Sequence, residues 1–331
     1  MATDETEDAL PEVAEESQGT HPDAETPKDE PDTTESNLVD LPPGEALTVE
    51  ESLSITLAQR TQLLVIAGAA SSGKTTLIAS LFHLFERAPF AGYLFAGSQT
   101  LIGFDKRCHL GRTACGGAWP DTERTKYGEV RQFLHLRLRK QESDRPPTDL
   151  LLLDLQGEHY REAMDSIEDC HRLPFLRRAD HFILLVDSHK LSQLSGRQKA
   201  KHEATMLLRS CLDANQLGPE SLVDVIFSKW DLVDENDEAQ TETFIRDLEE
   251  SITQHFAPRL RRLRLARIAA RPENPGFELG YGLADLFPSW VEESPATTIT
   301  PNRPVCPADA PTEFDRYLKR RLVLLTTEVA E

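Results

Sequence analysis

The stretch Gly68-Ala69-Ala70-Ser71-Ser72-Gly73-Lys74-Thr75 decides the fold, because it matches GxxxxGK[ST], the pattern of a phosphate-binding loop. The apolar run QLLVIA (62–67) precedes it and the helical pattern TLIASLFHLF (76–85) follows it. A glycine at each end lets backbone N–H groups turn toward a phosphate, and the helix adds the positive end of its dipole. The alternative is a Gly/Ser-rich turn, against which the strand and helix context argues.

We therefore expect this loop to hold the phosphates of a nucleoside triphosphate together with Mg²⁺. Lys74 would bridge the β- and γ-phosphates, and the Thr75 hydroxyl would bind the metal ion. The residues expected to line the phosphates are Gly68, Ser71, Ser72, Gly73, Lys74, Thr75 and Thr76.

From residue 62 onward, short apolar runs alternate with longer amphipathic stretches, a pattern typical of a parallel sheet between two layers of helices. It predicts a three-layer α/β fold with a mostly parallel, six-stranded sheet and helices on both faces. The expected strands are 62–67, 132–138, 149–155, 181–187, 222–228 and 263–269. The expected helices are 74–86, 158–172, 190–214, 237–256 and 282–287. Because polar and apolar residues alternate in 132–138, we expect that strand at an edge of the sheet.

The net charge of −20 is concentrated at the start of the chain. Residues 1–50 carry 16 Asp and Glu against one Lys and contain no Phe, Tyr or Trp, so they cannot bury enough apolar surface to offset chain entropy. We expect a disordered acidic tail over 1–50 and one catalytic domain over 60–290. A Pro-rich linker and a C-terminal helix are expected over 291–331.

The body outside the tail carries −5, which gives it no general attraction for nucleic acid or anionic membranes. The start MATDETEDAL does not resemble a secretory signal, and no run of 18 apolar residues appears. We expect a cytoplasmic protein without a membrane span. The five cysteines lack CxxC spacing, which predicts free thiols (Cys108, Cys115, Cys170, Cys211 and Cys306). The alternative is a metal site built on Cys108, His109 and Cys115, which lacks an evident fourth ligand.

A second motif, DLQG, spans Asp154 to Gly157 at the end of an apolar strand. Ligands of open α/β sheets bind at this carboxyl edge, so the Asp154 carboxylate is expected to hold Mg²⁺ through water. The Gly157 N–H would approach the γ-phosphate. Glu158 comes next and acts either as a base or as a first-turn residue of the following helix. His159 is expected at the surface.

A third motif, Ser228-Lys229-Trp230-Asp231, follows the strand 222–228, and the run RIAAR (267–271) ends the last strand. On its own SKWD also fits an ordinary turn at a strand end. Its position after the phosphate loop and DLQG gives it weight. The Arg-rich run 259–267 offers RNA binding as an alternative, but leucines alternate through it as in a strand.

In this order GAASSGKT, DLQG, SKWD and AAR resemble the translation-factor and Ras-like (TRAFAC) class of phosphate-loop GTPases over about residues 60–290. The resemblance implies a Ras-like fold that binds GTP or GDP with Mg²⁺. It implies that Asp231 accepts hydrogen bonds from guanine, that the Lys229 stem packs along the base, and that the Ala270 N–H meets guanine O6.

Two residues depart from the pattern of this class. Ser228 stands where the class has Asn or Thr, and it keeps a hydroxyl that could brace the phosphate loop. Glu158 stands where Ras-like GTPases have the Gln that orients the attacking water.

The segment 88–131 holds seven glycines and two prolines and is too long for a routine connection. In GTPases such a segment carries a Thr that reaches Mg²⁺ and the γ-phosphate. Thr125 is our candidate and Thr122 the alternative. Arg112 or Arg124 would serve as an arginine finger in cis, unless these side chains are simply solvated.

The stretch FAGSQTLIGFDKR (95–107) is similar to the second type of bacterial double-GTPase proteins. This resemblance implies a partner GTPase or another protein effector, in a signalling or defence system, and makes 88–131 the effector segment. We thus expect a GTP hydrolase that acts as a switch, with catalytic residues Lys74, Thr125, Gly157 and Glu158 and metal ligands Thr75, Asp154 and Thr125. The alternatives are an ATPase, a small-molecule kinase with its acceptor site in 282–331, or a nucleotide-binding scaffold without hydrolysis.

Overall fold

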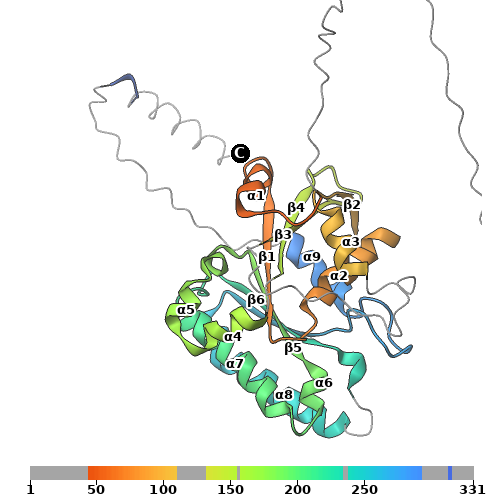
Figure 1. Cartoon of the computed structure of the whole chain (residues 1–331), viewed down its shortest axis with the longest axis vertical. Helices are drawn as coiled ribbons and strands as arrows, with labels where there is room; N and C mark the ends of the chain where they lie inside the picture. The colour runs from red at the N-terminus through yellow and green to blue at the C-terminus, as the bar shows by residue number, and fades with distance from the viewer. Residues whose placement is uncertain (1–43, 110–131, 155–156, 234–237, 293–311, 315–331) are drawn as a thin grey trace, which may run out of the picture. The chain divides into compact units, whose positions relative to one another are not determined.

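The computed structural model describes residues 44–109, 132–154, 157–233, 238–292 and 312–314 (Figure 1). Within them a seven-stranded sheet has the order β2-β3-β4-β1-β5-β6-β7. In chain order the strands are β1 (Thr61–Gly68), β2 (Tyr93–Gly97), β3 (Phe133–Lys140), β4 (Thr148–Asp154), β5 (His181–Asp187), β6 (Leu222–Ser228) and β7 (Arg262–Arg267). The pairs β2–β3 and β3–β4 are antiparallel and the other four are parallel.

The predicted three-layer, mostly parallel α/β architecture is confirmed, but the predicted strand count of six is wrong. The additional strand is β2, which lies in the segment 88–131 and pairs with the outer side of β3. For the same reason β3 is not an edge strand, contrary to our expectation.

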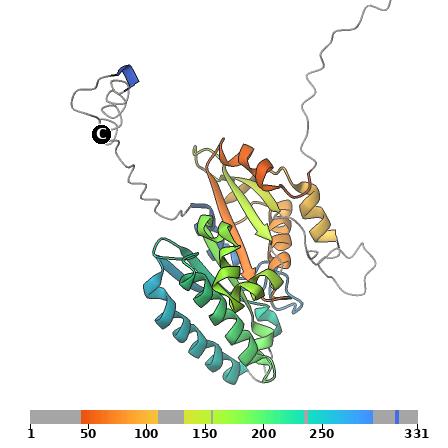
Figure 2. The same ribbon diagram turned by 60° about the vertical axis from the view of Figure 1, so that its left-hand side comes forward.

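Helices cover both faces of the sheet (Figures 1 and 2). One face packs against α1 (Val49–Thr56), α4 (Gly157–Asp165), α5 (Ile167–His171), α7 (Arg197–Asp213) and α8 (Glu238–Phe256). The other face packs against α2 (Lys74–Arg87), α3 (Leu101–His109) and α9 (Leu283–Glu292). The described chain also forms the short helices α6 (Ser188–Ser192), η2 (Pro174–Arg178), η3 (Trp230–Leu232) and η5 (Ala257–Arg259). None of these described helices is both long enough and apolar enough to cross a bilayer.

Two of the predicted helices are each divided by a local signal. The stretch 158–172 breaks at Ser166, whose side chain accepts hydrogen bonds from the N–H groups of Glu168 and Asp169 and so starts α5. The stretch 190–214 breaks at a turn that ends at Gly196, just before α7.

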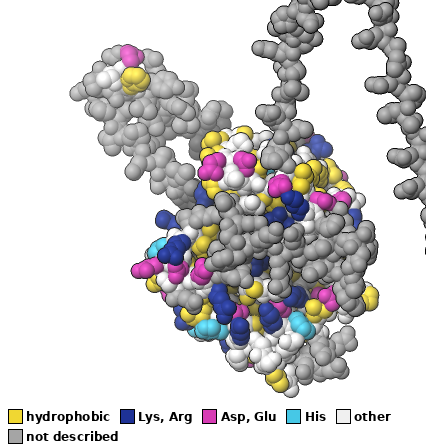
Figure 3. Space-filling view, in the orientation of Figure 1, with side chains coloured by type: hydrophobic (Ala, Val, Ile, Leu, Met, Phe, Trp, Pro, Cys, Tyr) yellow, Lys and Arg dark blue, Asp and Glu magenta, His cyan; other side chains and the backbone are white. Residues whose placement is uncertain are grey.

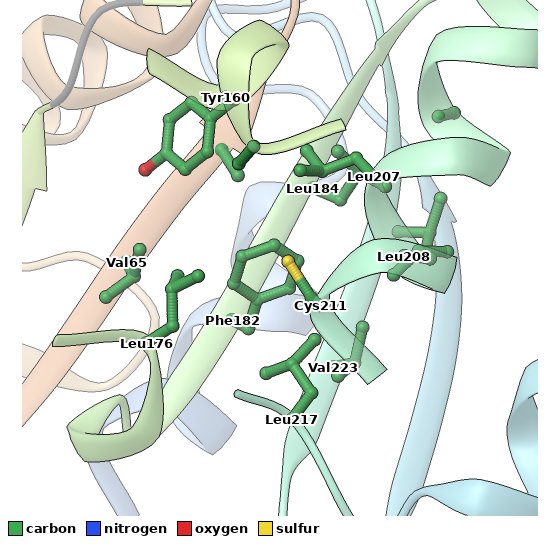
Figure 4. Packing of buried hydrophobic residues seen from close by; sticks show 14 of the residues in the cluster. Val65, Tyr160, Leu176, Phe182, Leu184, Leu207, Leu208, Cys211, Leu217 and Val223 are labelled. Atoms are coloured by element: carbon green, nitrogen blue, oxygen red, sulfur yellow. The ribbon is translucent and has the colours of Figure 1, made fainter. Parts of the chain in front are cut away.

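The apolar runs of the strands are continuous because alternate residues enter two separate cores. In β1, Val65 and Ala67 belong to the core under α4, α7 and α8, whereas Leu64 and Ile66 belong to the core under α2 and α9. Figure 4 shows part of the first core, where Phe182 of β5 lies among side chains from the covering helices. Burial on both faces is the expected environment of central parallel strands.

The polar residues of β3 are engaged inside the fold. His135 is only 2% exposed, and its Nε2 lies 3.0 Å from Asp149 Oδ1 on β4. Arg137 Nε donates to the same oxygen at 2.7 Å. The alternation that suggested an edge strand therefore reflects a buried ion-pair network.

The arginines of the run 259–267 also make ion pairs within the domain. Arg264 donates to both carboxylate oxygens of Asp224 at 2.9 and 2.8 Å, and Arg262 reaches the same carboxylate at 3.3 Å. Arg267 pairs with Glu242 of α8 at 2.8 Å. These contacts fasten β7 to its neighbours and explain why a strand carries so many guanidinium groups.

The described fold begins before residue 60, where we expected the domain to start. Leu47 is 3% exposed, and its backbone N–H and carbonyl each form a 2.8 Å hydrogen bond with Phe133. Thr48 and Glu51 then form a capping box at the start of α1. Residues 44–57 are thus part of the packed body.

Candidate nucleotide-binding site

The phosphate loop joins β1 to α2 at the carboxyl edge of the parallel strands, in a conformation that needs glycine at two positions. Gly68 has φ +143° and Gly73 has φ +93°. A Cβ on Gly68 would lie 2.6 Å from the Leu185 carbonyl oxygen and 2.7 Å from Ser72 Oγ. Gly73 starts α2 without a side-chain cap, so the helix presents its first N–H groups to a ligand rather than to a capping residue.

Lys74 lies over this loop instead of extending into solvent. The residue is 7% exposed, and its Nζ donates to the carbonyl oxygens of Gly68 and Ala69, each at 3.0 Å. Thr75 and Thr76 are half-buried in the first turn of the same helix. The ammonium group and the helix start therefore face one small region, which suits a phosphate chain.

The DLQG motif lies beside the phosphate loop. A Cβ on Gly157 would fall 2.5 Å from the Ala70 backbone nitrogen and 2.9 Å from the Ala69 carbonyl carbon. Only glycine permits this approach, because backbone atoms cannot move aside as a flexible side chain can. Asp154 ends β4 next to β1, in register with Ile66. The side chains of Asp154, Glu158 and His159 lie outside the described atoms.

Ser228 connects the SKWD loop to the phosphate loop. Its Oγ lies 2.7 Å from the Ser72 carbonyl oxygen and 3.2 Å from that of Val186. The expected brace is thus present, with a serine hydroxyl donating to the phosphate loop. It links the two loops directly.

Lys229 adopts a left-handed conformation, with φ +56°, which is uncommon for a residue with a side chain. Its Nζ donates to Asp187 Oδ2 at 2.8 Å. Asp187 is 3% exposed and lies 3.8 Å from Lys190, whose Nζ donates to the Ala70 carbonyl at 3.2 Å. Sequence reasoning missed Asp187 and Lys190. The available signal was the position of Asp187 at the end of an apolar strand, like that of Asp154.

Asp231 is 7% exposed, and its Oδ2 accepts a 2.8 Å hydrogen bond from the Glu273 backbone N–H. The neighbouring Trp230 N–H donates to the Ile268 carbonyl at 3.0 Å. This bond places the predicted loop at Ala270 beside the SKWD motif. The Ala270 carbonyl accepts from Gly280 at 3.1 Å, which fixes the turn after β7.

Four predicted residues of the effector segment, Thr122, Thr125, Arg112 and Arg124, lie outside the described residues. In the part of the chain that the structure describes, no group of three His, Cys, Asp or Glu side chains could hold a metal ion. Cys108 is buried, and its Sγ lies 3.7 Å from the Ala79 carbonyl oxygen. Cys115 and the His109 side chain are not described. Cys108, Cys170 and Cys211 are free thiols.

Comparison with known proteins shows the family of the chain. The sequence profile of the double-GTPase 2 family matches residues 62–291, which include all four motifs. The chain belongs to the double-GTPase 2 family. Among proteins of curated function, none matches the sequence significantly.

Solved structures similar to this double-GTPase 2 chain include translation-factor and signal-recognition-particle-receptor GTPases. A bacterial selenocysteine-specific elongation factor, EF-Sec, is 18% identical with a TM-score of 0.31, over 64% of this chain and 26% of its own. The signal recognition particle receptor SRb–GTP/SRX complex of Chaetomium thermophilum is 14% identical with a TM-score of 0.37, over 70% of this chain and 97% of that chain. SelB of Methanococcus maripaludis, with the GTP analogue GPPNHP, is 15% identical with a TM-score of 0.35, over 71% of this chain and 34% of its own.

Proposed function

We propose that this chain binds GTP with Mg²⁺, hydrolyses the GTP, and switches its effector segment 88–131 between two states. The observation that carries the proposal is the hydrogen bond from Ser228 to the Ser72 carbonyl. It joins a base-reading loop to a phosphate loop in one site, which is the arrangement a nucleotide requires. Membership of the double-GTPase 2 family supports guanine as the base.

In this proposal the first turn of α2 and Lys74 hold the phosphates. Thr75 and Asp154 would hold Mg²⁺, since the strand ending in Asp154 pairs directly with the strand that enters the loop. The bound metal ion supplies positive charge to the phosphate oxygens. Lys74 and the backbone N–H groups act by positioning and electrostatics, and they need little rearrangement because the loop is already formed.

The base would be read on the other side of the loop. Asp231 would accept from guanine N1 and N2, while the Glu273 N–H fixes the orientation of its carboxylate. The Lys229 stem would pack along the base, held by Asp187. The Ala270 N–H would meet guanine O6, since the turn that contains it lies beside Trp230.

Switching would involve Gly157, because its backbone already lies against Ala70 and a γ-phosphate would lie near both. We propose Thr125 as the second phosphate-sensing residue and Glu158 as the residue that positions water. The effector would be a protein, with a partner GTPase in a bacterial signalling or defence system as our specific proposal. The proposed location is the cytoplasm.

The decisive experiment is titration of the purified full chain with GTP, GDP and ATP, with and without Mg²⁺. GTP and GDP are expected to bind at least about 100-fold more tightly than ATP, because adenine lacks the two donors that Asp231 would accept. The substitution Asp231→Asn replaces one acceptor oxygen by a donor amide, so it should weaken GDP binding. It should favour xanthosine diphosphate, whose base carries a carbonyl oxygen in place of the guanine 2-amino group. Asp285→Asn, an exposed carboxylate at the start of α9, is the matched control.

Equal binding of ATP and GTP would overturn guanine specificity and favour an ATPase or a small-molecule kinase. Hydrolysis needs a separate measurement, namely phosphate release in a single turnover. Tight GTP binding without phosphate release, even with the partner added, would identify a scaffold instead of a hydrolase.

A further inference from the structure

A cavity of about 340 Å³ opens between α4 and α7, on the outer side of the phosphate loop. Its lining includes the backbone of Gly68, Ala69 and Ala70 together with Gly157 at the start of α4. Lys74, Thr75, Lys229 and Asp231, which build the proposed nucleotide site, are not part of the lining. The cavity therefore adjoins the nucleotide site. It shares with that site the loop backbone, Gly157, and the pair Asp187 and Lys190.

The walls of the cavity are apolar. Tyr160 of α4, Leu184 of β5 and Leu207 of α7 line it, and Figure 4 shows Leu184 next to Leu207, with Tyr160 farther along the same cluster. Ala200 and Ala204 form the α7 wall, where their small side chains leave space. The volume lies within the range of small-molecule sites, which combine apolar walls with a few charged groups.

The polar part of the lining favours an anion. Arg161, Lys190 and Lys199 line the cavity together with two carboxylates, Asp187 and Glu203. Asp187 is also bound by Lys229, a cation from outside the cavity. Glu203 lies 4.0 Å from Lys199, whose side chain is 69% exposed, so this pair is weak. Figure 3 shows Lys and Arg side chains gathered over the region of α6 and α7.

We propose that this cavity binds a small molecule with an apolar or aromatic body and one anionic group. The body would lie against Tyr160, Leu184 and Leu207, and the anion would lie near Lys199 and Arg161. The proposal concerns a site distinct from that of the nucleotide. It adds a ligand class that the proposed GTP site does not account for.

The position of the cavity also couples its ligand to the nucleotide, an extension that rests on the proposed function. Gly157 and Ala70 are in backbone contact, and both line the cavity. A γ-phosphate that draws Gly157 toward the loop would change the shape of this wall. If the cavity ligand prefers one shape of this wall, its binding is coupled to that of the nucleotide. By linkage, each of the two then changes the affinity of the other by the same factor.

The binding claim is tested with 1-anilinonaphthalene-8-sulfonate, a fluorescent probe with an aromatic body and one anion, titrated into the full nucleotide-free chain. Ala204→Phe fills the cavity from the α7 wall and should weaken probe binding at least about tenfold. His202→Phe adds the same ring on the exposed side of α7 and should leave binding unchanged. The proposed site would be contradicted if both variants weakened probe binding equally, or if Ala204→Phe did not weaken it at all.

Charge selectivity provides a test that does not depend on how Ala204→Phe folds. Lys199 lies at the exposed mouth of the cavity. The substitution Lys199→Glu should weaken binding of the sulfonate probe about threefold or more. It should leave binding of the uncharged analogue N-phenyl-1-naphthylamine unchanged. An equal effect on the two probes would show that the cavity does not select an anion, which contradicts the proposal.

Coupling is measured by repeating the sulfonate titration with GDP and with a non-hydrolysable GTP analogue at saturation. We expect the probe to bind the GDP-bound and the GTP-analogue-bound chain with different affinities. Identical affinities would contradict the proposed coupling. If neither guanine nucleotide binds, the proposed function fails, while probe binding that is blocked by Ala204→Phe still supports the cavity site. The two failures are therefore distinguishable.

Discussion

Among single residues, Asp187 shows how the candidate site depends on a side chain outside its motifs. Lys229 holds a left-handed backbone conformation, which persists only where neighbouring contacts enforce it. Asp187 is the buried carboxylate that binds its ammonium group at 2.8 Å. Asp187→Asn keeps the shape but removes the charge, so we expect GDP affinity to fall about five- to tenfold, mostly through faster dissociation. Stopped-flow release of a fluorescent GDP analogue measures this.

The control for this prediction is Asp213→Asn, which likewise replaces a carboxylate by a neutral amide. Asp213 forms an ion pair with Arg259. That pair has a 2.9 Å separation, but both side chains are 44% exposed, so its loss should not alter GDP release. If Asp187→Asn released GDP at the wild-type rate, Lys229 would be held by its loop alone and Asp187 would have no positioning role.

The motif residues could be predicted from the sequence because their chemistry depends on local backbone shape. Gly68 and Gly73 have the positive φ angles that a phosphate loop requires, and they stand at fixed spacing from Lys74. Asp187 could not be predicted in this way, because its partner lies 42 positions along the chain. The pairing arises only when β5 and β6 lie side by side in the sheet.

Among secondary-structure elements, the strands whose bounds the sequence predicts most accurately are those buried on both faces. β5 and β6 are buried along their whole length and were predicted with their observed bounds. β2 was missed because it has five residues, YLFAG, of which only Tyr93 is fully buried. Its position follows from pairing with β3 rather than from its own composition. Missing β2 led directly to the wrong edge assignment for β3.

The network around Asp149 joins β3, β4 and the loop before α3, and it gives a prediction about pH. His135 and Arg137 of β3 bind Asp149 of β4, and the Gln99 N–H, just before α3, donates to His135 Nδ1 at 3.0 Å. Burial raises the pKa of Asp149, but the hydrogen bonds from His135 and Arg137 outweigh it and hold the pKa below its usual value. The ionised carboxylate therefore stabilises the fold above its unfolded-state pKa, and this stabilisation is lost as pH falls through the lower native pKa.

Accordingly, Asp149→Asn should lower the free energy of unfolding by about 2 to 4 kcal/mol at pH 7. The difference from wild type should shrink below about pH 4, as the wild-type carboxylate is protonated. Urea unfolding at several pH values measures both effects. Asp180→Asn is the comparison, because burial raises the pKa of Asp180 and the pH trend should have the opposite sign. A pH-independent loss in Asp149→Asn would mean that packing, not charge, is responsible.

In the molecule as a whole, the end of the acidic segment and the start of the packed residues do not fall at the same place in the chain. The acidic composition extends to residue 50, whereas the packed part of the described chain already includes Leu47 and α1. Composition could not predict this boundary, because Leu47 lies inside the acidic segment, Ile55 lies just beyond it, and neither belongs to a continuous apolar run. Their burial, at 3% and 2% exposure, depends on the sheet that they cover.

Two truncations separate these boundaries. Removing residues 1–43 takes away 14 Asp and Glu and one Lys from a segment without Phe, Tyr or Trp, so GDP affinity and melting temperature should stay at full-length values. Removing residues 1–59 also removes Leu47 and Ile55. Each buried aliphatic side chain contributes about 2 to 4 kcal/mol, so the melting temperature should fall by about 10 °C or more. Differential scanning fluorimetry with and without GDP compares the melting temperature of each truncated chain with that of the full chain. A large loss of GDP affinity after removal of residues 1–43 would assign the acidic segment to the nucleotide site. An unchanged melting temperature after removal of residues 1–59 would place α1 outside the cooperative fold.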